Sequence, residues 1–314
     1  MKKLLKQFGK VIEDVDLKEH NTFKIGGRAT YLVRPDTSAD VKDLVTLLKE
    51  QDIKFYVLGN GSNVIFSDNY FDGVIIKLDK LCAIEVYGVF GKAFAEAGAM
   101  MPSVAAECLE ESLEGFEWAV GLPGTVGGSV VTNAGCYGTS TFDILKSVTC
   151  IDTEGNFAKF EHDEIEYGYR TTMFKENKSH IILVAEFELK KGNRKVMKER
   201  ITDRRKRRQK EQPLEYPSAG SIFRNPNGED PTIKEKIAKY KLKGPFAGHL
   251  IEECGLKGKK IGGAEVSTKH ANFIINTGNA TANDVKNLIE LVHDEVLKKF
   301  EIDLIYEQEL VNWE

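Results

Sequence analysis

The stretch GLPGTVGGSVVTNAG, residues 121–135, holds five glycines in fifteen positions. Glycine at this density costs conformational entropy on folding, so such a passage needs a compensating reason. One reason is a backbone that must pass close against a flat or phosphorylated ligand. The stretch therefore predicts a loop that lies close against a ligand of this kind.

A second glycine-rich stretch lies earlier, in LGNGSNVIF, residues 58–66, between two segments rich in strand-forming residues. Exposed backbone N–H groups in such a loop can hold a phosphate, although by itself the stretch could equally be a simple turn. It is not G-x-G-x-x-G, because Val64 stands at the third glycine, so a Rossmann fold is disfavoured. Two glycine loops together suit the pyrophosphate of a dinucleotide better than either alone.

Length and charge set the broad class of the protein. The chain has 314 residues, enough for two or three domains, and a formal net charge of −4. This balance gives no general attraction to nucleic acid or to an anionic membrane, so neither is predicted as a partner. Because the sequence has no long apolar run and no apolar signal segment at its start, we expect a cytoplasmic protein.

The cysteines and histidines do not predict a metal site. The five cysteines are widely spaced and form no C-x-x-C pair, which indicates reduced thiols rather than disulfides. The six histidines are scattered, without H-E-x-x-H or similar spacing. We predict no bound metal and no obligate protein partner.

The order of apolar patterns predicts an α+β protein in three parts. Residues 1–80 alternate helix and strand, whereas residues 81–200 contain short strands around the long glycine-rich passage. A helix that grows increasingly basic connects these parts to residues 201–314. We therefore expect two lobes followed by a C-terminal domain.

Local signals place several elements within these parts. Ser38 and Thr281 are each expected to cap an amphipathic helix, and a further helix is expected around residues 104–113. Residues 154–156 suggest the tip of a β-hairpin. The basic helix is expected to begin near Asn193 and to end before a proline.

Three charged motifs are candidates for function. Arg170, in EYGYRTTMF, could hold a carboxylate through two parallel hydrogen bonds, although a lone arginine is more often a surface group. RRKRR, residues 204–208, could contact nucleic acid, but on a helix in this acidic chain it is more often a solvated or anion-facing side. YEQEL alternates as a strand would, which predicts that Glu307 and Glu309 share a face.

Seven motifs occur in order along nearly the whole chain: NTFKIGGRA, LGNGSNVIFSD, GLPGTVGGSVVTNAGCYG, YGYRTTMF, QPLEYPSAGSIFRNP, GHLIEECGLKG and KHANFIINTGNATANDV. Together they resemble the UDP-N-acetylenolpyruvoylglucosamine reductase family, also called UDP-N-acetylmuramate dehydrogenases. The resemblance implies an FAD enzyme of bacterial peptidoglycan synthesis. It further implies that this enzyme uses NADPH to reduce UDP-N-acetylglucosamine enolpyruvate to UDP-N-acetylmuramate.

The resemblance also implies a fold and a set of cofactor residues. The fold is a two-lobed FAD-binding domain of the vanillyl-alcohol-oxidase type, residues 1–80 and 81–200, with a C-terminal α+β substrate domain, residues 201–314. FAD is expected to bind non-covalently at both glycine loops. The residues expected to contact it are Gly59, Asn60, Gly61, Ser62, Asn63, Gly121, Pro123, Gly124, Thr125, Gly127, Gly128, Asn133 and Gly135.

The catalytic residues implied by the resemblance are an arginine, a serine and a glutamate. Arg170 is the arginine that follows a tyrosine, and it is suited to stabilising an enolate-like charge. Ser221, and not Ser218, falls on the proton-donating serine of the S-A-G-S motif, while Glu309 falls on the terminal glutamate. The residues expected to contact the substrate are Tyr169, Lys210, Asn225 and His270.

The chain departs from the family pattern at three places. YEQEL replaces the usual L-E-P-E-V, so Glu309 is assigned by its register alone. Arg224 stands where lysine is usual, which preserves charge but not geometry. The chain between Arg170 and Ser221 is too short for an inserted loop that carries a substrate-covering tyrosine, so the shorter branch of the family is the better match.

Two alternatives compete with this interpretation. A related FAD oxidase could use the same loops with another substrate, but such enzymes often tether the flavin through histidine, and neither loop has a histidine in it or beside it. A non-enzymatic module could contact nucleic acid through RRKRR. Binding of FAD by the purified protein would argue against this non-enzymatic alternative.

Overall fold

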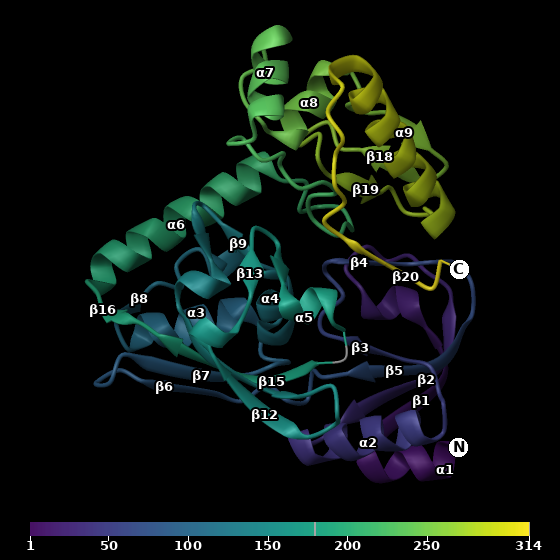
Figure 1. Cartoon of the computed structure of the whole chain (residues 1–314), viewed down its shortest axis with the longest axis vertical. Coiled ribbons are helices and arrows are strands. Elements are labelled where there is room, and N and C mark those ends of the chain that lie inside the picture. The colour runs from purple at the N-terminus through teal and green to yellow at the C-terminus, as the bar shows by residue number, and fades with distance from the viewer. Residues whose placement is uncertain (179, 314) are drawn as a thin grey trace. The chain divides into compact units, whose positions relative to one another are not determined.

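The protein is described here by a computed structural model, which covers residues 1–178 and 180–313. It divides into two compact units, and both are discontinuous in sequence (Figure 1). The first unit consists of Met1–Val15, Ala29–Asn60 and Asp72–Arg208. The second consists of Asp16–Arg28, Gly61–Phe71 and Gln209–Glu314. The three-part division at residues 80 and 200 stays a prediction.

One sheet of the first unit has the strand order β1-β2-β5-β3, in which β3 and β5 run parallel. Helix α2 (Ser38–Glu50) buries Val41, Leu44 and Leu48 in the same hydrophobic core as Val74 and Ile76 of β5. The strands of this sheet are β1 (Gly9–Asp16), β2 (Arg28–Pro35), β3 (Phe55–Leu58) and β5 (Phe71–Lys77).

The other sheet of the first unit has the order β12-β11-β15-β7-β6, and its neighbouring strands are antiparallel. Its buried side chains share the core of α2, and α3 and α4 pack against its strands. These elements are β6 (Ile84–Tyr87), β7 (Lys92–Glu96), α3 (Met101–Glu110), α4 (Val126–Thr132), β11 (Leu145–Ile151), β12 (Phe157–Glu161) and β15 (Ile181–Glu188). Shorter elements are α1 (Lys2–Leu5), β8 (Leu113–Glu114), β9 (Gly135–Cys136), β10 (Thr139–Ser140), β13 (Tyr167–Gly168), β14 (Thr171–Thr172), α5 (Met173–Glu176) and β16 (Lys190–Lys191).

Several local predictions can be compared with these elements. The hairpin is confirmed, since β11 pairs with β12 and Asp152 Oδ1 accepts the N–H of Glu154 at 2.9 Å within the tip. The cap at Ser38 is wrong by one residue, because Thr37 Oγ1 accepts the Asp40 N–H at 3.1 Å and Ser38 is already helical. Helix α3 begins three residues before the predicted 104–113, because Pro102 fits the first turn of a helix.

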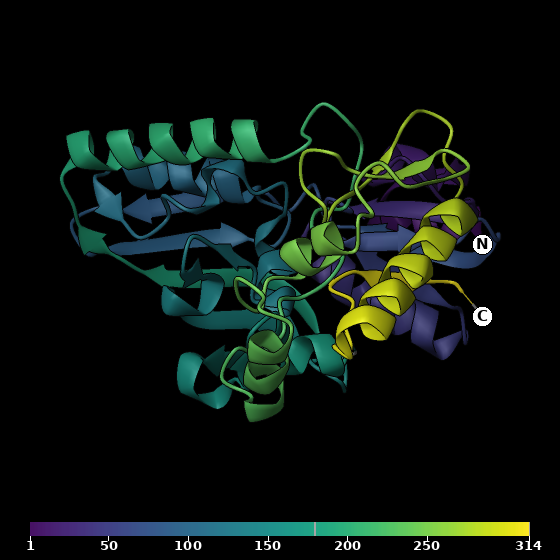
Figure 2. The ribbon, with the colours of Figure 1, turned by 90° about the horizontal axis from the view of Figure 1, so that it is seen from above.

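The basic helix is confirmed as α6 (Arg194–Glu211), and Figure 2 shows it as a long, straight helix. It buries Met197 and Ile201, and Arg200 Nη1 lies 3.2 Å from the carboxylate of the buried Glu117. These contacts fix α6 on the first unit. Among the residues that the structure describes, no helix is long and apolar enough to cross a membrane.

The second unit contains the sheet β17-β18-β19, against which helix α9 packs. Thr281 caps α9 as predicted, because its Oγ1 accepts the Asp284 N–H at 3.0 Å. The predicted apolar face of α9 is also confirmed, since Val285, Leu288 and Val292 are buried in the core. The elements are β4 (Val64–Phe66), α7 (Pro231–Lys239), α8 (Ala247–Glu253), β17 (Lys260–Ile261), β18 (Ala264–Val266), β19 (Ile274–Asn276), α9 (Ala282–Phe300) and β20 (Glu309–Val311).

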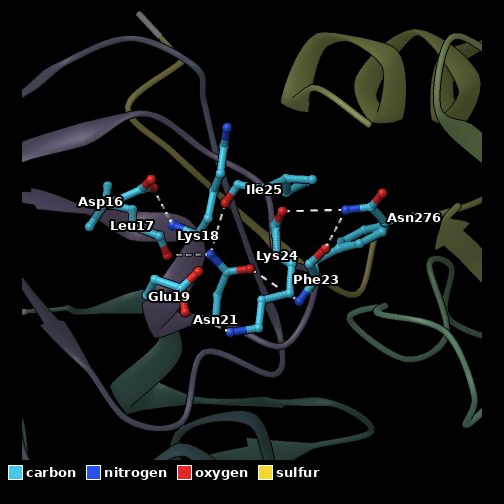
Figure 3. A network of polar contacts seen from close by, with 9 residues as sticks. All are labelled: Asp16, Leu17, Lys18, Glu19, Asn21, Phe23, Lys24, Ile25 and Asn276. Atoms are coloured by element: carbon cyan, nitrogen blue, oxygen red, sulfur yellow. Dashed lines mark hydrogen bonds and ion pairs between the residues drawn. The ribbon is translucent and has the colours of Figure 1, made fainter. Parts of the chain in front are cut away.

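Of two buried asparagines, Asn21 shapes the segment Asp16–Arg28 and Asn276 attaches it to the rest of the second unit (Figure 3). Asn21 Nδ2 donates to Leu17 O at 2.7 Å and to Ile25 O at 2.8 Å, so the segment folds around its own side chain. Asn276 Nδ2 then donates to Phe23 O at 3.2 Å, at a sequence distance of 253 residues. The N-terminal segment is thereby fixed against β19.

A histidine on α9 makes a second polar contact in this unit. His293 Nδ1 lies 3.0 Å from Asp294 Oδ1, and His293 Nε2 lies 2.7 Å from Asp303 Oδ1. Partial burial lowers the pKa of His293, but the hydrogen bonds to the two carboxylates outweigh it and raise the pKa above its usual value. Only the protonated ring can donate from both nitrogens at once.

We predict that Asn21→Ala lowers the free energy of unfolding by about 1–3 kcal/mol, because it leaves buried carbonyl groups without a donor. Urea unfolding of the apoprotein, followed by circular dichroism, measures this change. Asn283→Ala is the control, since Asn283 is exposed on α9 and should change stability by less than about 0.5 kcal/mol. Equal effects of the two variants would contradict the structural role of Asn21.

We predict that His293→Gln destabilises the protein at pH 5 but not at pH 8.5. The pKa of His293 is raised in the folded state, so its stabilisation is full below the unfolded pKa, about 6.5, and disappears as the pH rises through the folded value. The expected loss at pH 5 is about 0.5–1 kcal/mol, since the pair is partly exposed. Urea unfolding at both pH values tests this, and an equal loss at both would refute it.

Candidate functional site

The first two residues of the first glycine loop, Gly59 and Asn60, meet the second glycine loop within the first unit. Asn60 Nδ2 donates to Pro123 O at 2.7 Å. Gly59 also packs directly on the second loop, because a Cβ added to it would lie 2.5 Å from Thr125 Oγ1. A glycine is therefore required at position 59 by contact between the loops.

The first loop has unpaired backbone donors. Within residues 1–178 and 180–313, the N–H groups of Asn60, Gly61 and Ser62 donate to no protein acceptor. Gly61 has a φ of +68°, a conformation that favours glycine. Successive unpaired N–H groups in a turn form a concave anion site. This loop therefore fits the diphosphate of a dinucleotide such as FAD.

The second loop is built differently, because part of it is the short helix α4 rather than an open loop. Thr125 caps this helix, and the N–H groups of Val126 and Gly127 donate to Ala99 O at 2.8 Å and Ala97 O at 2.9 Å. A Cβ at Gly127 would lie 2.9 Å from Ala97 Cβ. The glycine at 127 thus serves packing against the protein's own backbone, and these donors already have protein acceptors.

Arg170 is attached to the second loop. It lies in the turn between β13 and β14, with a φ of +60° that is uncommon for a residue with a side chain. Its guanidinium donates to Asn133 O at 3.3 Å and to Gly135 O, and it lies 5.1 Å from the ring centroid of the exposed Tyr169. Asn133 in turn donates from Nδ2 to Gly168 O at 2.9 Å, which fixes the turn on the loop.

The basic end of α6 also lies against the second loop. A Cβ at Gly121 would lie 2.7 Å from Arg208 Cδ, and burial lowers the pKa of Arg208. The guanidinium groups of Arg204 and Arg207 lie 5.6 Å and 5.7 Å from the ring centroid of Tyr137. Positive charge is therefore concentrated beside the loop.

Cys136, next to these arginines, is not an activated thiol. Burial raises the pKa of Cys136, although the nearby arginines oppose the effect. Its Sγ donates to Trp118 O at 3.2 Å. A protonated, hydrogen-bonded thiol suits packing rather than nucleophilic chemistry.

In the second unit, the turn that carries Ser221 is held through its backbone. Gly220 has a φ of +79° and lets the chain turn into Ser221. The buried Gln308 donates from Nε2 to Ala219 O at 3.1 Å and to Ser221 O. Ser221 also forms an antiparallel bridge with Phe273, and Asn272 Nδ2 donates to Phe223 O at 2.8 Å.

Glu309 and the end of the first loop are joined in the same unit. The Glu309 N–H donates to Asn63 O at 3.0 Å, and Asn63 Nδ2 donates to Glu307 O at 3.3 Å. The predicted strand across YEQEL is wrong in extent, because β20 begins only at Glu309. The chain changes partner there: Tyr306 bridges to Phe223, whereas Glu309 pairs in parallel with Val64. Gln308 lies between Tyr306 and Glu309, where the chain passes from one pairing partner to the other.

The remaining substrate candidates are distributed over the second unit. Asn225 is exposed, and its Oδ1 accepts the Ala247 N–H at 3.0 Å, while Lys210 is exposed on α6. His270 Nδ1 accepts the Asn272 N–H at 3.2 Å, which leaves the proton of the neutral ring on Nε2. Burial lowers the pKa of His270 and so favours this neutral form.

The predicted residues fall into two groups. The first unit brings together Gly59, Asn60, Gly121, Pro123, Gly124, Thr125, Gly127, Gly128, Asn133, Gly135, Tyr169 and Arg170. In the second, Asn63, Ser221 and Glu309 are connected through Gln308 and its neighbours, whereas Lys210 has no such contact among the described residues. Sequence reasoning missed Gln308 and Asn272. The sequence marks them only as polar residues within an apolar or strand-like stretch, as Asn272 is within ANFIIN, residues 271–276.

Comparison with known proteins identifies the family. The family models for "UDP-N-acetylenolpyruvoylglucosamine reductase, C-terminal domain" and "FAD binding domain" match residues 212–311 and 29–161. These matches and the mixture of helices and strands confirm the predicted α+β plan of an FAD-binding domain with a C-terminal domain.

Whole-chain relatives agree with these matches. The UDP-N-acetylenolpyruvoylglucosamine reductase of Clostridium botulinum strain Hall is 40% identical over 304 residues, 97% of this chain and 93% of that protein. That of Caldanaerobacter subterraneus is 40% identical, over 99% of this chain and 96% of that protein. The crystal structure of the Thermus caldophilus reductase has a TM-score of 0.76 at 29% identity and covers 97% of this chain and 100% of that chain. The chain belongs to the UDP-N-acetylenolpyruvoylglucosamine reductase family of FAD-dependent oxidoreductases.

Proposed function

We propose that the protein uses NADPH to reduce the enolpyruvyl ether of UDP-N-acetylglucosamine enolpyruvate to the lactyl ether of UDP-N-acetylmuramate. This step belongs to the synthesis of peptidoglycan precursors. Family membership supports the reaction, and the names of the relatives support the substrate. A cytoplasmic location is part of the proposal, and the free cysteines are consistent with it.

One observation links the proposed reaction to particular residues. Gln308 holds the backbone of Ser221, and the next residue, Glu309, donates its N–H to Asn63 O at 3.0 Å. The proposed proton donor, the proposed glutamate and the end of the proposed cofactor loop therefore belong to one hydrogen-bonded cluster. A cluster of purely structural polar residues would not need to combine these three positions.

The two glycine loops are proposed to hold FAD without a covalent bond. The unpaired N–H groups of Asn60, Gly61 and Ser62 would bind its diphosphate, while Thr125 and α4 would form a rigid wall beside it. When bound, FAD would supply hydride-transfer chemistry between NADPH and the terminal alkene carbon of the substrate.

Arg170 is proposed to stabilise the charge that develops on the substrate. Hydride addition to the alkene leaves negative charge on the neighbouring carbon, and this charge spreads into the carboxylate as an enolate. A guanidinium is always protonated and can donate several hydrogen bonds to such a group. The hydrogen bonds of Arg170 to Asn133 O and Gly135 O support this role, because they fix the guanidinium before the substrate arrives.

Ser221 is proposed to donate the proton that completes the reduction. A serine hydroxyl is a weak acid in water, so its position and its neighbours must assist the transfer. Glu309 is proposed to shape the site or to polarise the intermediate. Beside developing negative charge its carboxyl must be protonated or paired with a cation. Tyr169, Lys210, Asn225 and His270 are proposed to contact the substrate.

We predict that Ser221→Ala slows reoxidation of the reduced flavin by the enolpyruvyl substrate by about 10²–10⁴-fold, the usual range for a general acid. Flavin reduction by NADPH should stay nearly unchanged. Anaerobic stopped-flow absorbance separates the two half-reactions, and Ser218→Ala is the matched control. If both half-reactions of Ser221→Ala slowed equally, the proton-donor role would be wrong.

The basic end of α6 is proposed to face the diphosphate of the substrate. Arg204 lies beside the ring of Tyr137, whereas Arg205 is exposed and has no such ring contact in the part of the chain that the structure describes. We predict that Arg204→Gln raises the KM for the UDP-sugar about 3- to 10-fold, whereas Arg205→Gln leaves it within about twofold. Steady-state kinetics at low and high salt measure this, and equal KM values for both variants would dismiss the assignment of Arg204.

A further inference from the structure

We propose that Thr22 is a positioning residue that sets Ser221 relative to the first glycine loop. This inference rests on the proposed function of Ser221. It assigns a role to the second residue of NTFKIGGRA, which the mechanism above does not use. Thr22, Gly61 and Ser218 all belong to the second unit.

Thr22 makes one hydrogen bond to each of the two segments. Its backbone N–H donates to Gly61 O at 3.1 Å, and its hydroxyl donates to Ser218 O at 2.7 Å. The hydroxyl also lies 3.5 Å from Gly61 O, but its single hydrogen is used in the shorter contact. Thr22 therefore joins the cofactor loop to the turn that carries the proton donor.

The residues on either side of Thr22 are held in place, so Thr22 can fix the serine turn relative to Gly61. Asn21 and Phe23, on either side of Thr22, are buried, and the Phe23 N–H donates to Asn21 Oδ1 at 3.1 Å (Figure 3). Gly61 packs directly on this segment, because a Cβ at Gly61 would lie 2.7 Å from Asn21 Cα. Thr22 consequently has little freedom to follow a movement of either neighbour.

The serine turn has other anchors on both sides of Ser218, and the one before it is the Asn276 N–H, which donates to Pro217 O at 2.9 Å. Gln308 holds Ala219 O and Ser221 O, and the Ile222 N–H donates to Asn272 O at 2.8 Å. Ser218 O lies between these anchors, and Thr22 holds it. Removing the Thr22 hydroxyl would therefore loosen the peptide group that follows Ser218, while Pro217 O, Ala219 O and Ser221 O keep their own donors.

The test compares Thr22→Val, which removes only the hydroxyl, with Thr22→Ser, which restores it. Because valine keeps the backbone N–H, FAD affinity measured by fluorescence titration of the apoprotein should stay within about twofold in both variants. Flavin reduction by NADPH should not change. Reoxidation by the enolpyruvyl substrate should slow about 10-fold in Thr22→Val, with a larger solvent deuterium isotope effect, and should recover to within about threefold in Thr22→Ser.

The outcomes separate this inference from the proposed function. Equal reoxidation rates in Thr22→Val and Thr22→Ser, or equal slowing of both half-reactions, would overturn the positioning role. Ser221→Ala is measured in parallel: if it leaves reoxidation unchanged, the proposed function fails rather than the role of Thr22. Should Thr22→Val not bind FAD, Thr22→Ala, which also keeps the backbone N–H, must show the same split or the inference is wrong.

Discussion

The hydrogen bond from Asn276 to Phe23 O joins residues 253 positions apart, and the architecture of the second unit depends on it. Phe23, Ile25 and Ile65 share a hydrophobic core with α9 and β19, but burial of apolar surface is not directional. The directional contact is the buried side-chain amide of Asn276, which bonds to Phe23 O, while Asn21 fixes the shape of the segment from within. The segment Asp16–Arg28 consequently has one register against the C-terminal part of the chain.

A second long-range contact in this unit brings two distant motifs together. Asn63 at the end of the first loop and Glu309 near the C-terminus are adjacent because β4 and β20 pair in parallel. Such pairing closes a large loop, so its entropic cost is met only when the apolar core around it forms as well. The polar positions are therefore coupled to the stability of the core.

How much could be predicted depended on the range of the interactions. Helix α9 and its cap at Thr281 follow from a local period and a local hydrogen bond, and both were predictable. The family motifs indicated Ser221 and Glu309 because their residue types recur in order. The partner change at Gln308 and the bond from Thr22 to Ser218 were not predictable, since a contact across 196 residues leaves no pattern in either segment. The helix within the glycine-rich passage was missed because its glycines indicated ligand contacts, whereas Gly127 serves packing against Ala97.

The side-chain anchors of the serine turn, Thr22 and Gln308, act on backbone carbonyl groups. Thr22 and Gln308 hold the turn at its oxygens, while Ser221 Oγ forms no hydrogen bond with the described residues. A hydroxyl already donated to a protein acceptor would lose that bond before it could give its proton to carbon, which would add to the barrier. Arg170 is fixed in a comparable way, through carbonyl groups of the second loop. In both cases the fold fixes position through neutral main-chain oxygens and not through an ion pair to a carboxylate.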